Sequence, residues 1–446
     1  MKKIFIAGAG LSTGYLIKYL LDNSVNKDWK IVVGDINFNH AIDKIDSHPN
    51  GKAVLFDAND KSQRKKLIRE ADIVISMLPA DLHYLLINDC VLLKKNMVTA
   101  SYVSEAMMKM NESAKKNGII LLNEVGVDPG IDHMSAMSGI DRIREKGGII
   151  TKFKSYTGGL LYSSNNNNPW KHKFTWNPRN FVLLGKDGAK YLENGDIKNL
   201  PYHLIYRNCD KLNFAGFGDF EVFPNRDSLK YKDIYGLEET STLIRGTMRL
   251  PGFCNAWDGL VRMGVTNDSH SFIVKGKMTY RDFIRSLLPE DNHSIAYLES
   301  KIARYLDVPE NSEIMIKLKW LGLFDEKTIP EGKYTPATIL HELLMEKWQL
   351  EPSDRDMVVM QHQIEYILNN IVRKTLLSSI VVGQDSRNTA MAKTVGLPVG
   401  IAVKLILEKK ISATGVIIPV QKEFYLPILK ELTEHGIKFY KEESDL

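Results

Sequence analysis

Lys3-Ile4-Phe5-Ile6-Ala7-Gly8-Ala9-Gly10-Leu11-Ser12-Thr13 lies near the start of the chain. Its first five residues predict an apolar strand, and residues 15–21 after it have the pattern of a helix. Glycine lets the turn between them close and lets the backbone approach a pyrophosphate, whose charge the N–H groups at the helix start can meet. The order of strand, glycine turn and helix is therefore typical of a dinucleotide-binding site.

An acidic residue further along the chain supports this interpretation. Asp35 ends a second apolar run, residues 30–34, at about the distance where a carboxylate would reach ribose hydroxyls. The third glycine of the usual fingerprint is replaced by Thr13, and Gly14 stands one position later. The glycine turn alone is thus a weak signal, and a parallel α/β domain with no nucleotide is the alternative.

The rest of the N-terminal region repeats the same alternation. Further apolar strands are predicted at residues 53–58, 73–78, 97–102 and 119–125, with helical patterns at 62–70 and 104–117 between them. Fully apolar strands that alternate with helices indicate a parallel sheet covered on both faces. We therefore expect an α/β, doubly wound domain over residues 1–127.

Composition narrows the class of protein. At 446 residues the chain is long enough for two or three domains, and 44% hydrophobic with 25% charged residues is ordinary for a globular protein. A net charge of +5, with no basic cluster, argues against nucleic acid as a partner. Three scattered cysteines fit a reducing compartment and give no metal-site spacing, so no metal is expected. The N-terminal apolar run breaks at Gly8 and no segment reaches membrane-spanning length, so we expect no membrane and a cytoplasmic location.

The pattern changes after the nucleotide-binding region. Strands are predicted at residues 147–157, 173–176, 357–367 and 373–382, with a polar loop at 163–169. Helices are predicted at residues 279–288, 293–306, 336–346, 389–407 and 424–435, and a short strand at 436–440. We therefore expect an α+β substrate-binding domain over 128–235 and 352–387 and a mainly helical insertion over 236–351. Residues 388–446 are expected to rejoin the first domain.

Five longer segments carry a resemblance to a known family. They are residues 96–102 (NMVTASY), 126–133 (GVDPGIDH), 223–228 (FPNRDS), 245–249 (RGTMR) and 390–398 (AMAKTVGLP). In this order they resemble the glutamate-forming saccharopine dehydrogenases, and the resemblance covers nearly the whole chain. It implies a Rossmann domain and oxidation of saccharopine to L-glutamate and 2-aminoadipate 6-semialdehyde. Lysine degradation is the expected pathway, and a homodimer is the expected assembly. In animals this module is fused to a lysine-ketoglutarate reductase, whereas this chain resembles the free-standing form and would work with a separate reductase.

The resemblance also implies which residues bind each ligand. The residues expected at the nucleotide are Gly8, Ala9, Gly10, Leu11, Asp35, Asp57, Ala58, Leu78, Ala100, Val127, Asp128 and Pro129. Those expected at the substrate are Ser101, Tyr102, Asp128, Arg226, Thr247, Met248 and Arg249. The chain departs from its fungal and animal relatives at Thr157, where they usually carry cysteine.

The chemistry of the reaction agrees with these residue types. Saccharopine carries three carboxylates, which guanidinium groups hold in two-point geometry; Arg226 and Arg249 are the better candidates and Arg245 is a structural one. Tyr102 and Asp128 follow successive strands, at the edge where ligands gather, and are the expected catalytic pair. Asp128 as a helix cap is the alternative, and His133 is a second-rank base.

Asp35 also leads to an expectation about the cofactor. Its carboxylate would accept both ribose hydroxyls of NAD and repel a 2′-phosphate, and no cation stands in residues 36–39. NAD is therefore expected over NADP, unless Lys61 or Arg64 reaches the phosphate. Two other functions stay open: a dehydrogenase of a carboxylated polyamine, and a non-catalytic nucleotide-binding regulatory protein.

Overall fold

The computed structural model describes residues 1–163, 168–214, 216–289 and 297–446. They form two compact units, each assembled from separate stretches of the chain. The first unit contains Met1–Thr151, Ile234–Leu237 and Asp356–Leu446, and the second contains Lys152–Asp233 and Glu238–Arg355.

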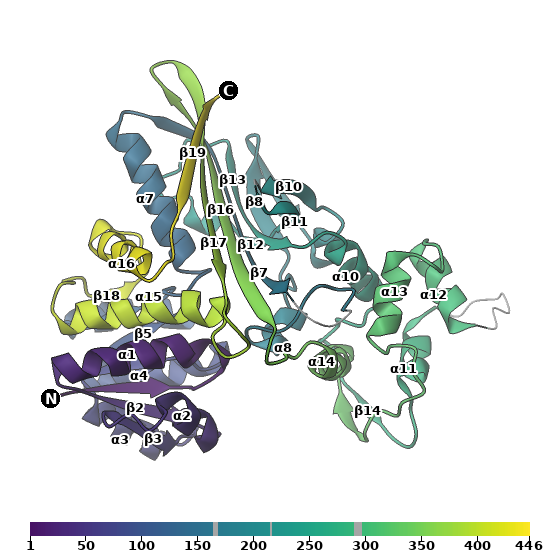
Figure 1. Ribbon diagram of the computed structural model, residues 1–446, viewed down its shortest axis with the longest axis horizontal. Helices are drawn as coiled ribbons and strands as arrows, with labels where there is room; N and C mark the ends of the chain where they lie inside the picture. The colour runs from purple at the N-terminus through teal and green to yellow at the C-terminus, as the bar shows by residue number, and fades with distance from the viewer. Residues whose placement is uncertain (164–167, 215, 290–296) are drawn as a thin grey trace. The chain divides into compact units, whose positions relative to one another are not determined.

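The first unit is built on a parallel sheet of seven strands in the order β18-β6-β5-β4-β1-β2-β3 (Figure 1). The strands are β1 (Lys2–Ala7), β2 (Trp29–Asp35), β3 (Gly51–Leu55), β4 (Ile73–Ser76), β5 (Asn96–Thr99), β6 (Ile120–Leu122) and β18 (Gly415–Ile417). The helices between them are α1 (Gly14–Lys27), α2 (Phe38–Ile45), α3 (Lys61–Glu70), α4 (His83–Leu93), α5 (Glu105–Met108) and α6 (Asn111–Lys116), with short turns η1 (Leu11–Thr13) and η2 (Ala80–Leu82). The predicted doubly wound α/β fold is confirmed.

Helix α15 (Ala390–Leu407) lies against α1 at unusually short range. A Cβ atom on Gly396 would lie 2.7 Å from the Leu16 nitrogen, and one on Gly400 would lie 2.6 Å from the Tyr19 ring. Glycine at these two positions therefore permits the close packing of the two helices.

Helix α15 is also 18 residues long with a mean hydropathy of 1.6, so by length and composition it could cross a membrane, contrary to the expectation that no segment could. Because 83% of it is buried within the protein, these features are those of a core helix.

Outside the parallel sheet, the first unit also contains three antiparallel strands and two further helices. They are β16 (Arg355–Leu368), β17 (Ile371–Val382), β19 (Tyr440–Asp445), α7 (Ile131–Glu145) and α16 (Lys422–Glu434). β17 pairs with both β16 and β19. The strand predicted at 436–440 is therefore wrong, because the chain becomes a strand only at Tyr440 and pairs with β17. The C-terminal strand that does join the parallel sheet is β18, which pairs with β6.

The second unit has a mixed sheet with helices packed beside it. Its strands are β7 (Ile149–Ser163), β8 (Ala189–Glu193), β9 (Asp196–Leu200), β10 (Asp210–Phe214), β11 (Gly218–Pro224), β12 (Arg226–Asp227) and β13 (Thr242–Arg249), and β14 (Phe272–Val274) pairs separately with β15 (Gly332–Tyr334). Its helices are α8 (Pro178–Val182), α9 (Tyr202–Ile205), α10 (Phe253–Arg262), α11 (Tyr280–Leu287), α12 (Leu298–Leu306), α13 (Glu313–Trp320) and α14 (Pro336–Lys347), with the turn η3 (Leu229–Tyr231). β13 pairs with β7 in parallel and with β11 antiparallel.

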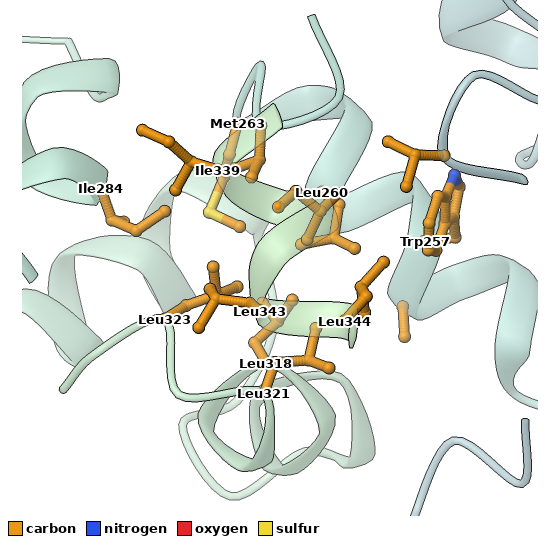
Figure 2. Close-up of a cluster of buried hydrophobic side chains, with 14 of the residues drawn as sticks. Trp257, Leu260, Met263, Ile284, Leu318, Leu321, Leu323, Ile339, Leu343 and Leu344 are labelled. Atoms are coloured by element: carbon orange, nitrogen blue, oxygen red, sulfur yellow. The ribbon is translucent and has the colours of Figure 1, made fainter. Parts of the chain in front are cut away.

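The helices of the second unit share one apolar core. Figure 2 shows its centre, where Leu343 and Leu344 of α14 lie among Leu260 of α10, Leu318 of α13 and Leu321. All five side chains are at most 2% exposed. Sequence signals set the ends of these helices: α11 and α14 begin with capping boxes at Thr279 and Thr335.

Several sequence expectations differ from this architecture. Residues 356–387 belong to the first unit, because β17 pairs with β19 and Leu377 packs beside Gly139 of α7. β13 is a central strand within the range expected to be a helical insertion. Residues 173–176 are not a strand. The predicted loop at 163–169 and the start of the predicted helix at 293–306 fall partly outside the described residues.

Candidate active site

The glycine turn after β1 has the backbone geometry that its sequence predicts. Gly8 has φ +101°, and a Cβ atom there would lie 2.7 Å from the Met77 carbonyl oxygen at the end of β4. A Cβ atom on Gly10 would meet no atom within 4 Å, so the space above this residue is open. Thr13, in the place of the third glycine, donates from Oγ1 to the Gly10 carbonyl at 2.8 Å and closes the turn. The turn can therefore hold a pyrophosphate at the start of η1 and α1.

The Asp35 carboxylate accepts hydrogen bonds from backbone N–H groups in and beside this turn. Its Oδ2 accepts the Ala9 N–H at 2.6 Å and its Oδ1 accepts the Asn37 N–H at 2.8 Å. Helix α2 then brings His40 to within 3.6 Å of Asp35 Oδ1, and Lys44 close enough for its ammonium to interact with the same carboxylate. Burial lowers the pKa of Lys44, and the charge of Asp35 opposes that shift. Two basic side chains thus lie at the end of β2.

Most of the other residues expected at the nucleotide follow strands of the same sheet. Asp57 and Ala58 follow β3, Leu78 follows β4, and Ala100 follows β5. In a parallel sheet, the carboxyl ends of the strands meet at one edge, where ligands bind. Their assignment to the nucleotide stays a prediction, as does that of Leu11, Val127 and Pro129.

The structure brings the two expected catalytic residues together. The Tyr102 hydroxyl donates to Asp128 Oδ1 at 2.9 Å, and both side chains are half-buried. α7 begins at Ile131 with Gly130 as its N-cap residue, so Asp128 does not occupy the capping position. The geometry therefore favours the paired role of Asp128 over the helix-cap alternative.

Ser101, the residue before this pair, takes part in a hydrogen-bonded chain that the sequence did not indicate. Its Oγ lies 2.6 Å from His83 Nε2, and Ser76 Oγ lies 2.7 Å from His83 Nδ1. Ser76 and His83 are 0% and 1% exposed. Burial lowers the pKa of His83 to about 4, so its ring is neutral near pH 7.

His133, the second-rank base, lies in a separate buried group. Its Nε2 lies 2.9 Å from Glu124 Oε2, and its Nδ1 lies 2.5 Å from the Tyr235 hydroxyl. Glu124 Oε1 also accepts the Val103 N–H at 2.9 Å. His133 and Glu124 are fully buried, so this group holds the backbone next to Tyr102 in place.

The residues expected at the substrate carboxylates lie in the second unit, on β12 and β13. Residues 245, 247 and 249 alternate along β13 and so share a face of the strand. Thr247 is in register with Thr157 of β7, the position where the family usually has cysteine. The Thr157 hydroxyl is buried and forms no hydrogen bond within the described residues.

Arg249 is a buried cation without an acidic partner in the described part of the chain. It is 3% exposed, and its guanidinium lies 5.1 Å from the Phe181 ring centre and 5.4 Å from that of Phe253. Nη1 donates to the Met248 carbonyl at 2.8 Å, while Nε has no hydrogen-bond partner among the described residues. Burial lowers the pKa of Arg249 to about 10, so the side chain stays charged near neutral pH. Such a group can accept a carboxylate from outside the protein.

The other two arginines differ from Arg249. Arg245 stacks on Tyr231 at 4.4 Å, in keeping with a structural role. Arg226 is exposed and has φ +59°, a conformation that aims its backbone away from the regular strand. The Met248 side chain is fully buried and its carbonyl accepts the Arg249 guanidinium, so the place of Met248 at the substrate stays a prediction.

Known proteins resemble the chain over its full length. Residues 4–122 match the model for the saccharopine dehydrogenase NADP binding domain, and residues 126–437 match that for the saccharopine dehydrogenase C-terminal domain. The chain belongs to the saccharopine dehydrogenase family.

Relatives of known name agree with this membership. The saccharopine dehydrogenase [NADP(+), L-glutamate-forming] of Schizosaccharomyces pombe is 32% identical over 100% of both chains, and that of Saccharomyces cerevisiae is 33% identical over 97% of this chain and 98% of its own. The solved apo structure of the L-Glu-forming enzyme from Saccharomyces cerevisiae covers 100% of both chains at 29% identity, with a TM-score of 0.87. The mitochondrial alpha-aminoadipic semialdehyde synthase of Mus musculus is 31% identical, and the chain spans 47% of its length.

These matches overturn the expected cofactor. The nucleotide-binding family model and the fungal relatives are named for NADP, so the prediction of NAD is wrong. The physical reason is visible at Asp35, whose two oxygens accept backbone N–H groups, and in α2, whose His40 and Lys44 lie beyond the four residues that the sequence argument considered. Arg64 is not the missing cation, because its Nε donates to Asp89 at 2.7 Å in the interior.

Proposed function

We propose that this member of the saccharopine dehydrogenase family oxidises saccharopine with NADP and releases L-glutamate and 2-aminoadipate 6-semialdehyde. The observation that carries the proposal is the resemblance to fungal enzymes of that name over whole chains. Two features support it separately: the glycine turn and the Tyr102–Asp128 pair of the first unit, and in the second unit the buried Arg249, which has no acidic partner within the described residues.

The residues at the glycine turn fit a nucleotide. Gly10 leaves the backbone open to a pyrophosphate, and Lys44 supplies positive charge at the end of β2 for a 2′-phosphate, with the His40 ring beside it. When bound, NADP supplies the hydride acceptor. The chain itself must bind the substrate, orient it and move protons.

Asp128 and Tyr102 are the groups proposed to move those protons. The secondary amine must first lose a proton to expose its lone pair, and a carboxylate in hydrogen-bond reach can take it. Hydride loss from the carbon that becomes the aldehyde leaves an imine. Water then adds to this imine, and the same pair can take a proton from the water and return one to the departing glutamate nitrogen. Tyr102, which donates to Asp128, holds the carboxylate in place between these steps.

Arg249, together with Arg226, is proposed to bind substrate carboxylates. A guanidinium that binds a carboxylate in two-point geometry fixes the position of the carbon that is oxidised. Thr157 and Thr247, in register on β7 and β13, add hydroxyl groups near this cation. Because Thr157 stands where the relatives usually carry cysteine, we assign no proton transfer to a thiol at that position.

The test is an assay of the purified chain with saccharopine and either NADP or NAD. We expect absorbance of the reduced nicotinamide to rise with NADP and saccharopine, and L-glutamate to accumulate in equal amount. Release of lysine and 2-oxoglutarate, or turnover only with another secondary amine, would contradict the proposal. A homodimer, a cytoplasmic location and a metabolic link to a separate lysine-ketoglutarate reductase are further proposals, and light scattering tests the first of them.

A further inference from the structure

His83 connects the sheet to Ser101, a residue expected at the substrate. It is the first residue of α4, next to the end of β4, and its two ring nitrogens contact the hydroxyls of Ser76 and Ser101 at 2.7 and 2.6 Å. Within the described residues, each of these two hydroxyl groups forms no hydrogen bond other than the one to His83. The hydrogen bonds of Ser76, His83 and Ser101 therefore form a series that runs from the interior of the sheet to the half-buried Ser101.

The protonation state of His83 determines in which direction its two hydrogen bonds to the serines can run. Burial lowers the pKa of the ring to about 4, and Asp81, the charged group that acts on it, opposes this shift. Near pH 7 the ring is neutral, with one N–H donor and one acceptor nitrogen. One serine must therefore donate to the ring, and the other must accept from it.

Ser76 decides between the two arrangements. Its side chain is 0% exposed, so its hydroxyl proton has no water to bind, and His83 Nδ1 is its hydrogen-bond partner in the described part of the chain. A buried hydroxyl that leaves its proton unused costs free energy. The satisfied arrangement has Ser76 donating to Nδ1 and His83 Nε2–H donating to Ser101 Oγ. The hydrogen of Ser101 is then left to point at a ligand.

We propose that His83 is a positioning residue that presents the Ser101 hydroxyl as a hydrogen-bond donor to a carboxylate oxygen of the substrate. The inference rests on the proposed function and extends it to two residues that no sequence motif indicated. This series of hydrogen bonds ends at the enclosed Ser76, so a proton cannot leave through it. Its role is to orient a donor, and it does not carry protons away from the reacting centre.

The first test is the tautomer of His83, read by NMR of protein labelled with ¹⁵N in histidine. We expect the proton on Nε2 and an unprotonated Nδ1 near pH 7, with the signal assigned by its loss in His83→Gln. A proton on Nδ1, or a doubly protonated ring, would overturn the proposal. Ser76→Ala removes the donor to Nδ1 and should shift the tautomer toward Nδ1–H.

The second test is a double-mutant cycle of His83→Leu and Ser101→Ala. We expect each change to raise the KM for saccharopine about tenfold with little change in kcat, because the hydrogen bond to a carboxylate forms in the bound substrate and persists in the transition state. The Kd for NADP should stay within a factor of about two. In the Ser101→Ala background, His83→Leu should have almost no further effect.

Equal effects of His83→Leu in both backgrounds would show a purely structural role and overturn the proposal. His83→Gln keeps an amide donor near Ser101, so it should restore part of the affinity, and it keeps the test usable where His83→Leu fails to fold. A wild-type KM in Ser101→Ala would also overturn the proposal, because Ser101 would not contact the substrate. The proposed function is judged separately, by the activity of the unaltered enzyme with saccharopine.

Discussion

Two sets of buried and half-buried polar side chains differ in how their hydrogen bonds are satisfied. Next to the parallel sheet, Tyr102 and Asp128 contact each other, and Ser101, His83 and Ser76 form a chain. Near the end of β13 in the second unit, several buried polar atoms have no hydrogen-bond partner within the described residues. Among them are Arg249 Nε, Thr157 Oγ1 and His172 Nε2.

The difference separates groups that are already oriented from groups that await a ligand. A polar group buried without a partner lowers the stability of the folded chain, so a cluster of them needs an explanation. Burial also lowers the pKa of His172 well below its usual value, helped by the charge of Arg249, so this histidine is neutral and adds no second charge. A carboxylate brought by a substrate would meet the unused donor of Arg249.

The largest expected effect comes from the oriented pair. Asp128→Asn keeps the size of the side chain and an oxygen that can accept the Tyr102 hydroxyl, but it cannot take a proton. We expect kcat with saccharopine and NADP to fall on the order of a hundredfold, in the range of lost general-base catalysis, with the thermal midpoint changed by only a few degrees. Near-normal turnover together with a large loss of thermal stability would show that Asp128 is structural.

Arg249→Met tests the unsatisfied cluster. Because the change removes a buried charge without an acidic partner, we expect the KM for saccharopine to rise roughly thirtyfold, about 2 kcal/mol, while thermal stability does not fall. NADP affinity, measured by fluorescence titration, should stay the same. Arg245→Met is the matched control on the same face of β13, and we expect it to lower stability, since Arg245 stacks on Tyr231, and to leave KM nearly unchanged. The opposite pattern in the two variants would reverse their roles.

Tyr102→Phe tests whether Tyr102 and Asp128 act together in catalysis. Loss of the hydroxyl removes the donor to Asp128 Oδ1, so we expect kcat to fall about tenfold. In the Asp128→Asn background the same change should have a much smaller effect, because both residues would serve one proton route. Additive effects in the double variant would mean that Tyr102 acts on the substrate independently of Asp128.

The sequence predicted the parts of this molecule that depend on local pattern. The glycine turn, the helix after it and the five helices expected after residue 250 follow from periodic apolar positions and caps, as α11 at Thr279 and α14 at Thr335 illustrate. β18 was missed because a strand of only three residues, the first of them a glycine, carries almost no strand signal. The start and end of β19 were missed because its residues are exposed and charged.

The site was predicted less completely than the fold, for two physical reasons. A carboxylate at the end of a strand can point to a ligand or to its own loops, and only the folded backbone shows that Asp35 accepts from Ala9 and Asn37. Contacts between residues on separate elements have no sequence spacing that reveals them. The register of Thr157 with Thr247 and the contact of His83 with Ser101 are both of this kind.

The smallest expected effect concerns the cofactor and the positive charge beside β2. In Lys44→Gln, the loss of one partly screened cation should raise the KM for NADP about three- to fivefold and leave the KM for NAD unchanged, because only NADP carries a 2′-phosphate. Lys61→Gln, on α3, is the matched control and should change neither value. Asp35→Asn should instead weaken both nucleotides alike, since its carboxylate holds the loops that contain Ala9 and Asn37. If Lys44→Gln raised both KM values equally, Lys44 would support the turn as Asp35 does, and the 2′-phosphate would have to bind to other residues.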